Sequence, residues 1–468
     1  MVFSSAIFLF GFLPGFLAAY FLTPARFRNV TVLIASYAFY GWWRIDFLGL
    51  FVLVTLWNYA LGWRVTSLDQ GRSRQIWLGV GVAGNLAVLA YFKYFNFGVE
   101  SFLAMLDVSA GEFSLWSVIL PIGISFYIFQ AISYLVDVHR GDAPPARNLI
   151  DFAAFIALFP QLIAGPVLRY KDLVDQFENR IHSWALFSEG AYRFALGLAM
   201  KVLIADSVAP VADLMFALPA PTAAEAWLGT TAYTIQLFFD FAGYSAMAIG
   251  LGLMMGFRFM ENFDNPYVSM SITEFWRRWH LSLSAWLRDY LYIPLGGSRL
   301  GKVRTYLNLF LTMLLGGLWH GASWTFVLWG AWHGVLLAIE RAFGVKAQVN
   351  APRHAPRILL TLLLVMIGWV LFRAPDLASA IAVYEGMIGL NGWSLGDEVA
   401  WQINSSHVFW MLIGWAVVYG MYFAPKIQSL TQSPRFRIYL ERGAALLLVF
   451  SAAKVLSSSY SPFLYFQF

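Results

Sequence analysis

The chain contains no cysteine among its 468 residues, and only 12 % of those residues are charged. The absence of thiols excludes disulfides, zinc–thiolate sites, iron–sulfur clusters and a cysteine nucleophile that forms a thioester. Any covalent chemistry must therefore use oxygen or nitrogen. The shortage of charge also sets the chain apart from ordinary soluble proteins, in which about 25 % of residues are charged.

Apolar residues make up 60 % of the sequence. One globular core cannot hide so many, because surface grows too fast relative to volume and a soluble surface needs charges. Lipid must therefore be the solvent for much of the chain. The net charge of +5 would suggest nucleic acid in a soluble domain, but in a membrane protein it fits basic cytoplasmic loops. We expect no nucleic-acid partner.

Apolar stretches of about 20 residues, the length that crosses the hydrocarbon layer, predict ten membrane spans. They lie at 5–22, 30–43, 47–62, 76–92, 116–138, 184–206, 227–256, 358–372, 406–424 and 443–458. Two more apolar segments, 150–166 and 305–340, are awkward in length. With no linker or repeat in view, the simplest prediction is a single all-α, polytopic integral membrane domain over 1–468.

Basic residues concentrate in alternate loops, such as those holding Arg26 and Arg28, and Arg72 and Arg74. The intervening loop 97–115 has no lysine or arginine, and neither has 207–226. The positive-inside rule places the basic loops in the cytoplasm and the amino terminus outside. The polar stretch 257–304 is predicted to form cytoplasmic interfacial helices.

The segment 305–339 has no Asp, Glu, Lys or Arg and is too short for two full crossings. We expect a helical hairpin or re-entrant pair over 305–340, with its midpoint at GLWHGASW, 317–324. His320 would then face a cavity at membrane depth. An ionisable side chain there suggests a functional site, and imidazole is well suited to move a proton. A backbone hydrogen bond between helices is the structural alternative; for His333 we favour packing.

The segment 273–297 is dense in tryptophan, tyrosine and arginine, which is typical of helices at the membrane surface. A functional interpretation is that Arg277, Arg278 and Arg288 line a mouth for an anionic, phosphate-rich donor, because arginine binds phosphate bidentately. His280 near that mouth is a candidate second site residue. Asp240 lies within an apolar run, and pairing with a tyrosine or arginine is favoured over catalysis.

The order of these motifs resembles the membrane-bound O-acyltransferase (MBOAT) family. The resemblance rests on GLWHGASWTFVLWGAWHG at 317–334, preceded by FWRRWHLSLSAWLRDYLYIPLGG and DFAGYSAMAIGLGLMMGFRF. It implies a ring of about eleven transmembrane helices, with short or re-entrant helices around a central tunnel. It also makes 305–340 the catalytic hairpin, His320 the family's catalytic histidine, and His280 the polar residue upstream of it.

The resemblance further implies a function. An acetyl group would pass from a cytoplasmic donor, expected to be acetyl-CoA, across the bacterial inner membrane to periplasmic acetyltransferase partners that modify an exopolysaccharide. Alginate is the first expectation and cellulose the alternative. We expect lipid as the surroundings, no metal and no permanently bound cofactor. Two rivals stay open: a transporter that catalyses nothing, and a membrane scaffold for a secretion complex.

Overall fold

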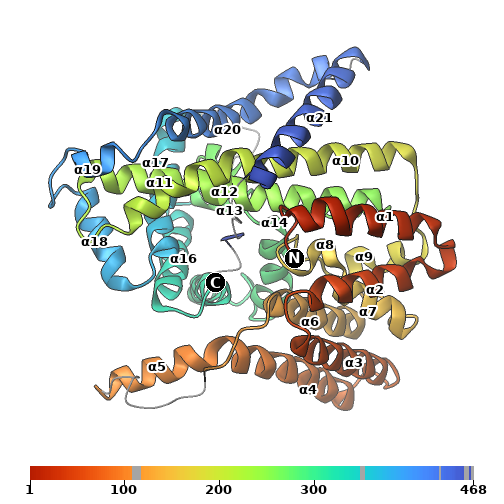
Figure 1. Ribbon diagram of the computed structural model, residues 1–468. Coiled ribbons are helices and arrows are strands. Elements are labelled where there is room, and N and C mark those ends of the chain that lie inside the picture. Colours follow the sequence, from red (N-terminus) through yellow and green to blue (C-terminus); the bar gives the residue numbers. More distant parts are fainter. Residues whose placement is uncertain (108–116, 348–353, 432–433, 458–462, 465–468) are drawn as a thin grey trace. The chain divides into compact units, whose positions relative to one another are not determined.

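The computed structural model describes residues 1–107, 117–347, 354–431, 434–457 and 463–464. Throughout these ranges the regular secondary structure is helical, with no strand (Figure 1). The chain forms two compact units, Met1–Gly190 with Leu251–Met260, and Ala191–Gly250 with Glu261–Phe468. Each unit has its own set of packed helices.

The first unit is built from the amino-terminal helices. They are η1 (Ile7–Phe12), α1 (Leu13–Leu22), η2 (Ala25–Phe27), α2 (Arg28–Gly41), α3 (Asp46–Thr66), α4 (Arg72–Leu89), η3 (Ala90–Tyr94), α5 (Phe95–Met105), α6 (Ile124–Arg140), α7 (Leu149–Ala157), α8 (Phe159–Leu162) and α9 (Tyr170–Glu178). Helices α3 and α4 lie side by side in Figure 1, and a buried pair, Asn58 and Asn85, joins them by side-chain hydrogen bonds of 3.0 and 2.6 Å.

The second unit holds the remaining helices and the end of the chain. Its elements are η5 (Met200–Ala205), α11 (Asp206–Phe216), η6 (Pro266–Val268), α13 (Ile272–Trp276), α14 (Leu281–Leu287), η7 (Arg288–Tyr292), α15 (Lys302–His320), α16 (Trp324–Ala342), α17 (Ala355–Arg373), α18 (Leu377–Met387), α19 (Asp397–Ala400), α20 (Ser405–Thr431) and α21 (Pro434–Ser457). Two helices contribute to both units: α10 (Trp184–Ala199) and α12 (Ala223–Met254).

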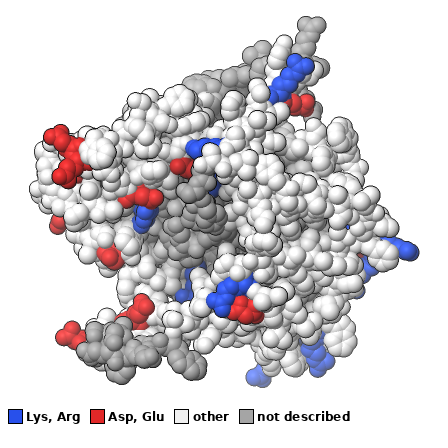
Figure 2. Space-filling model, in the orientation of Figure 1, with Lys and Arg blue, Asp and Glu red and all other residues white. Residues whose placement is uncertain are grey.

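Five helical stretches of the described chain are long and apolar enough to cross a membrane. They are Asp46–Thr66, Arg72–Met105, Trp184–Phe216, Ala223–Met254 and Ala355–Arg373. Shorter apolar helices add to them at Ile7–Leu22 and Leu377–Met387. Charged side chains are sparse on the face shown in Figure 2, and many large apolar side chains are exposed, as a surface in contact with lipid requires.

Three predicted boundaries were wrong. The span predicted at 116–138 begins only with α6 at Ile124, because Gly123, the residue before the helix, has a left-handed φ of +71° that a right-handed helix does not contain. The predicted loop 97–115 is helical as far as Met105. The predicted loop 207–226 is helical as far as Phe216 despite Pro210, since Val208, Val211 and Met215 are buried. Each such side chain gains roughly 1.5–3 kcal/mol by burial, which together outweighs the roughly 3 kcal/mol cost of an interior proline.

Candidate active site

Helices α15 and α16 form a closely packed hairpin in the second unit. A Cβ on Gly317 would lie 2.4 Å from the carbonyl oxygen of Phe326, and one on Gly330 would lie 2.5 Å from that of Met313. Glycine is therefore needed for the two backbones to approach so closely. His320 is the last residue of α15, just before the extended Gly321. The hairpin thus holds the imidazole at a helix end, where a break leaves room beside it.

His320 lines a cavity of about 270 Å³ within the second unit. The walls come from α13, α14, η7, α15 and α16, and are mostly apolar. They are formed by Thr273, Trp276, Arg277, Leu283, Ser284, Leu287, Arg288, Tyr292, Leu309, Thr312, Met313, Gly316, His320, Trp329 and Leu337. The His320 ring is itself enclosed by aromatic rings, with the centroids of Trp329 and Phe372 at 5.1 and 5.3 Å. We call this space the His320 cavity.

Two of the three arginines proposed for a phosphate-rich donor line the His320 cavity. Arg277 is exposed, and in the described part of the chain it forms no ion pair. Arg288 is also exposed and pairs with its neighbour Asp289 at 2.7 Å. Guanidinium groups at the wall of an apolar space favour anions. Arg277 and Arg288 together can therefore bind a negatively charged group that remains in water.

Arg278 lies apart from the cavity wall. Its guanidinium is buried and bound by Glu274 and Asp264, each at 2.9 Å, and it also donates to the main-chain oxygen of Asp264 at 2.9 Å. With these acceptors already in place, Arg278 holds together the segment 264–278 rather than a ligand. The structure therefore corrects the predicted phosphate role of Arg278.

His280 is completely buried close to His320, with ring centroids 6.2 Å apart, and is not among the cavity-lining residues. Its backbone is left-handed, with a φ of +45°, which is uncommon for a residue with a side chain and points to a constrained position. Burial, with no carboxylate acting on it, lowers the pKa of His280 below its ordinary value, so the imidazole is neutral at pH 7.

Asn262 determines which nitrogen of His280 carries the proton. The Asn262 side-chain oxygen lies 3.0 Å from His280 Nδ1 and accepts from the main-chain N–H and the hydroxyl of Ser282 at 3.3 and 2.8 Å. Since a main-chain N–H can only donate, that Asn262 atom is the oxygen, and Nδ1 must carry the hydrogen. Nε2 is then an acceptor, and it has no hydrogen-bond partner among the described residues. A neutral His280 in this tautomer has no second N–H, so it cannot donate a hydrogen bond to an oxyanion.

His333 is a packing residue. It is fully buried, its Nδ1 accepts from Trp276 Nε1 at 3.3 Å, and its ring lies against Trp276 and Trp329 with centroids 5.2 Å away from each. These contacts agree with the preference for packing over catalysis at His333, which stays a prediction. Through Trp276, it supports a wall of the His320 cavity.

Asp240 is a buried structural acid. Lys201 Nζ lies 2.8 Å from its carboxylate and 2.5 Å from that of Asp206, and the main-chain N–H of Leu464 donates to Asp240 at 2.9 Å. Structural pairing is thus confirmed, although the partner is a lysine and not the tyrosine or arginine expected. The missed signal was that Lys201 also lies within an apolar run, where a cation needs a carboxylate.

Sequence reasoning also missed residues that shape the site without charge of their own. Thr273, Trp276, Ser284 and Tyr292 line the His320 cavity, and Asn262 orients His280. Thr273, Trp276, Ser284 and Tyr292 all fall inside the aromatic, polar segment 273–297, so the segment was found but its inward-facing members were not. No sequence signal distinguished Asn262 from other polar residues of 257–304.

Residues 32–372 match the MBOAT, membrane-bound O-acyltransferase family, which is most of the chain and includes the hairpin and both histidines. The chain belongs to this family. It is therefore an acyltransferase and a multi-pass membrane protein, and the predicted all-α, polytopic fold class is confirmed. The ring of about eleven spans around a tunnel stays a prediction.

Several named relatives are similar to the chain over its whole length. It is 53 % identical to the probable alginate O-acetylase AlgI of Azotobacter vinelandii and 54 % identical to that of Pseudomonas putida, in each case over 100 % of both chains. It is 33 % identical to the peptidoglycan O-acetyltransferase of Helicobacter pylori, over 100 % of this chain and 98 % of the relative.

Proposed function

We propose that the protein is an O-acetyltransferase of the bacterial inner membrane that serves the O-acetylation of an exopolysaccharide, with alginate as the polymer. The observation that carries the proposal is His320 at the break between α15 and α16, lining an apolar cavity that also has two exposed arginines on its wall. The alginate assignment rests on relatives that are about half identical over the full chain and are named alginate O-acetylases.

The size of the His320 cavity favours a donor that enters only in part. Pockets that enclose a whole small ligand have volumes of roughly 300–1,000 Å³, and about 270 Å³ is below that range. We propose that the thioester arm of acetyl-CoA lies in the cavity, while its phosphates stay outside on Arg277 and Arg288. The apolar walls would keep water from the thioester and limit its hydrolysis.

In the proposed transfer, the acceptor hydroxyl oxygen attacks the thioester carbonyl carbon and the C–S bond breaks. His320 takes the hydroxyl proton, and the donor sulfur leaves as a thiolate that is protonated afterwards. His280 Nε2 has a lone pair and no hydrogen, so His280 gives no proton in this transfer. We further propose that the acceptor belongs to a periplasmic acetyltransferase partner, which passes the acetyl group to the polymer.

Replacement of His320 with alanine tests the assignment. The purified full chain in detergent, supplied with radiolabelled acetyl-CoA and a hydroxyl acceptor, should lose acetyl transfer by roughly 10²–10⁴-fold, the usual contribution of a general base. His407→Gln is the matched control, because His407 lies at the start of α20 and is not among the cavity-lining residues. Retained transfer by a folded His320→Ala protein would refute the catalytic role. Uptake of acetyl-CoA into vesicles without consumption of the thioester would favour the transporter instead.

A further inference from the structure

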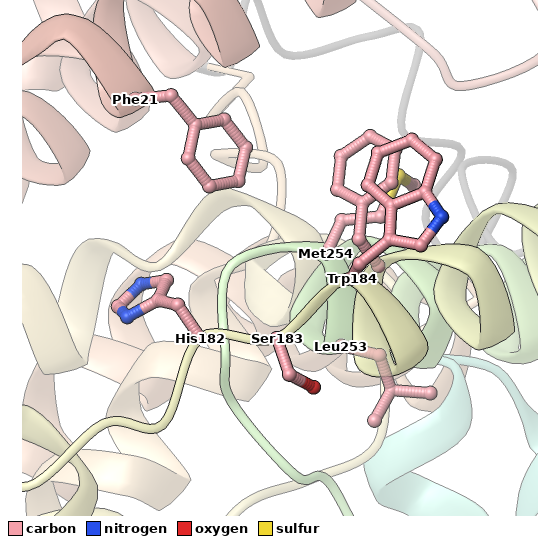
Figure 3. Close-up of a pocket in the computed structure, with 7 residues that line it drawn as sticks. Phe21, His182, Ser183, Trp184, Leu253 and Met254 are labelled. Atoms are coloured by element: carbon pink, nitrogen blue, oxygen red, sulfur yellow. The ribbon is translucent and has the colours of Figure 1, made fainter.

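The first unit contains a cavity of about 360 Å³ that the acyl transfer does not use. It is lined by Phe21 at the end of α1, by residues at the start of α10, and by the last turn of α12. Its lining residues are Phe21, His182, Ser183, Trp184, Phe187, Leu253 and Met254. Figure 3 shows Phe21 on one side and Trp184 with Met254 on the other, with His182 at one edge.

The walls and the rim of this cavity are apolar. Five of the seven lining residues are aromatic or aliphatic, so the cavity itself suits a hydrocarbon chain. Large apolar side chains also stand out around it: Trp184 is 80 % exposed, Ile181 72 % and Leu22 84 %. Such a rim is unfavourable in water and is typical of a surface that dips into the membrane interface.

Two arginines lie at the His182 edge. Arg28 Nη1 is 3.2 Å from His182 Nε2, and the Arg28 guanidinium lies 5.9 Å from the centre of the Phe21 ring. Arg180, two residues before His182, lies 5.9 Å from the ring centre of Tyr20, and its buried Nη1 has no hydrogen-bond partner among the described residues. Apolar walls with cations at one edge are complementary to an anionic amphiphile.

Neither arginine is neutralised by a carboxylate. Within the described chain, no acidic group lies within 4.0 Å of the Arg28 or Arg180 guanidinium. The acid that acts on Arg180 from further away, Asp151, instead accepts hydrogen bonds from Asn29 at 2.5 Å and from Asn148 at 2.7 Å. Arg180 Nη2 donates to the Asn29 side-chain oxygen, which is uncharged, so the positive charges of Arg180 and Arg28 are not cancelled by any nearby carboxylate of the described chain.

The backbone around His182 is fixed, so the cavity has a defined shape. Gly256 has a φ of +84°, and a Cβ there would lie 2.8 Å from the carbonyl oxygen of Ile181. The Tyr20 hydroxyl lies 2.8 Å from both the Met255 carbonyl oxygen and His182 Nε2. These contacts join the end of α1, the 181–182 segment and the turn after α12.

We propose that this cavity is a binding site for one anionic phospholipid. An acyl chain lies between Phe21 and Trp184, and the phosphate group meets Arg28 and Arg180 beside His182. The loop with Arg28 is the one predicted to be cytoplasmic, so the lipid would come from the cytoplasmic leaflet. The site is independent of the acetyl transfer proposed above.

The test compares phosphatidylglycerol with phosphatidylcholine on the purified full chain, using native mass spectrometry to count retained lipids over a concentration series. Each cation near a membrane surface should raise the affinity for an anionic lipid about fivefold, so the two arginines should favour phosphatidylglycerol by about 25-fold. Arg28→Gln with Arg180→Gln should abolish this preference. Met254→Trp should fill the cavity and weaken retention of both lipids.

Arg26→Gln is the matched control, because it removes one cation from the same loop without touching the cavity wall. It should keep the preference. Should the double variant not fold, Arg28→Gln alone must lower the preference about fivefold. Equal retention of the two lipids by the native chain would overturn the proposal, as would a preference that Arg26→Gln reduces as much as Arg28→Gln. Displacement of the lipid by millimolar inorganic phosphate would show a phosphate site and also overturn it.

Discussion

Glu340 is predicted to control the affinity for the donor without touching it. Its carboxylate, near the end of α16, accepts from the main-chain N–H groups of Ile272 and Thr273 at 2.6 and 2.8 Å, and from the Thr273 hydroxyl at 2.6 Å. It therefore fixes the start of α13. That helix and the residue after it carry Thr273, Trp276 and Arg277 on the wall of the His320 cavity.

The size of the effect follows from the acceptors that each substitution leaves. Glu340→Gln keeps one oxygen, so one of the two N–H groups loses its partner and the other bond loses its charge assistance. A hydrogen bond to a charged group contributes roughly 1.5–3 kcal/mol when buried. Glu340 is half-buried, and water replaces part of that loss, so we expect about 1–2 kcal/mol for Glu340→Gln.

If this free energy of about 1–2 kcal/mol is lost from donor binding, KM for acetyl-CoA rises roughly 5- to 30-fold, while kcat stays within about twofold. Glu340→Ala should raise KM further, since both N–H groups are then left without the carboxylate. The assay is steady-state acetyl transfer with acetyl-CoA varied at fixed acceptor. Glu385→Gln, on α18, is the control for loss of one carboxylate. A fall in kcat with unchanged KM would refute the positioning role, because it would place the effect on the chemical step.

Two further predictions concern His280 and the hairpin. Because burial lowers the pKa of His280, the unfolded state binds the extra proton below about pH 6.5, and stability falls as the pH drops from 7 to 5. His280→Asn should make the thermal unfolding midpoint in detergent less dependent on pH over this range. Gly317→Ala should lower the free energy of unfolding of the protein by about 1–3 kcal/mol, since the added methyl meets the Phe326 backbone. Gly316→Ala, whose methyl meets only a flexible Leu287 methyl at 3.3 Å, should change the midpoint far less.

Much of the helical fold could be predicted from hydropathy, because lipid selects apolar stretches by length. The predicted spans 30–43 and 47–62 correspond to α2 and α3, and 227–256 corresponds to α12. The predicted boundaries were wrong where tertiary contacts determine the position at which a helix ends. Burial of α11 side chains carries the helix past Pro210, and contacts far along the chain, not local propensity, determine such burial.

The candidate site shows the same limit at the level of single residues. Arg277 and Arg278 are adjacent and chemically identical, so composition and spacing assign them the same role. The fold gives them different surroundings. Glu274 lies one helical turn before Arg278 on the same face of the chain and binds its guanidinium, whereas Arg277 lines the cavity. A carboxylate four residues before an arginine in a short helix could have indicated this pairing. His280 had no comparable sign, because its tautomer depends on Asn262, eighteen residues away and outside any motif. Charge and helix period thus locate a site in such a chain, while the proton positions that decide its chemistry require the tertiary contacts.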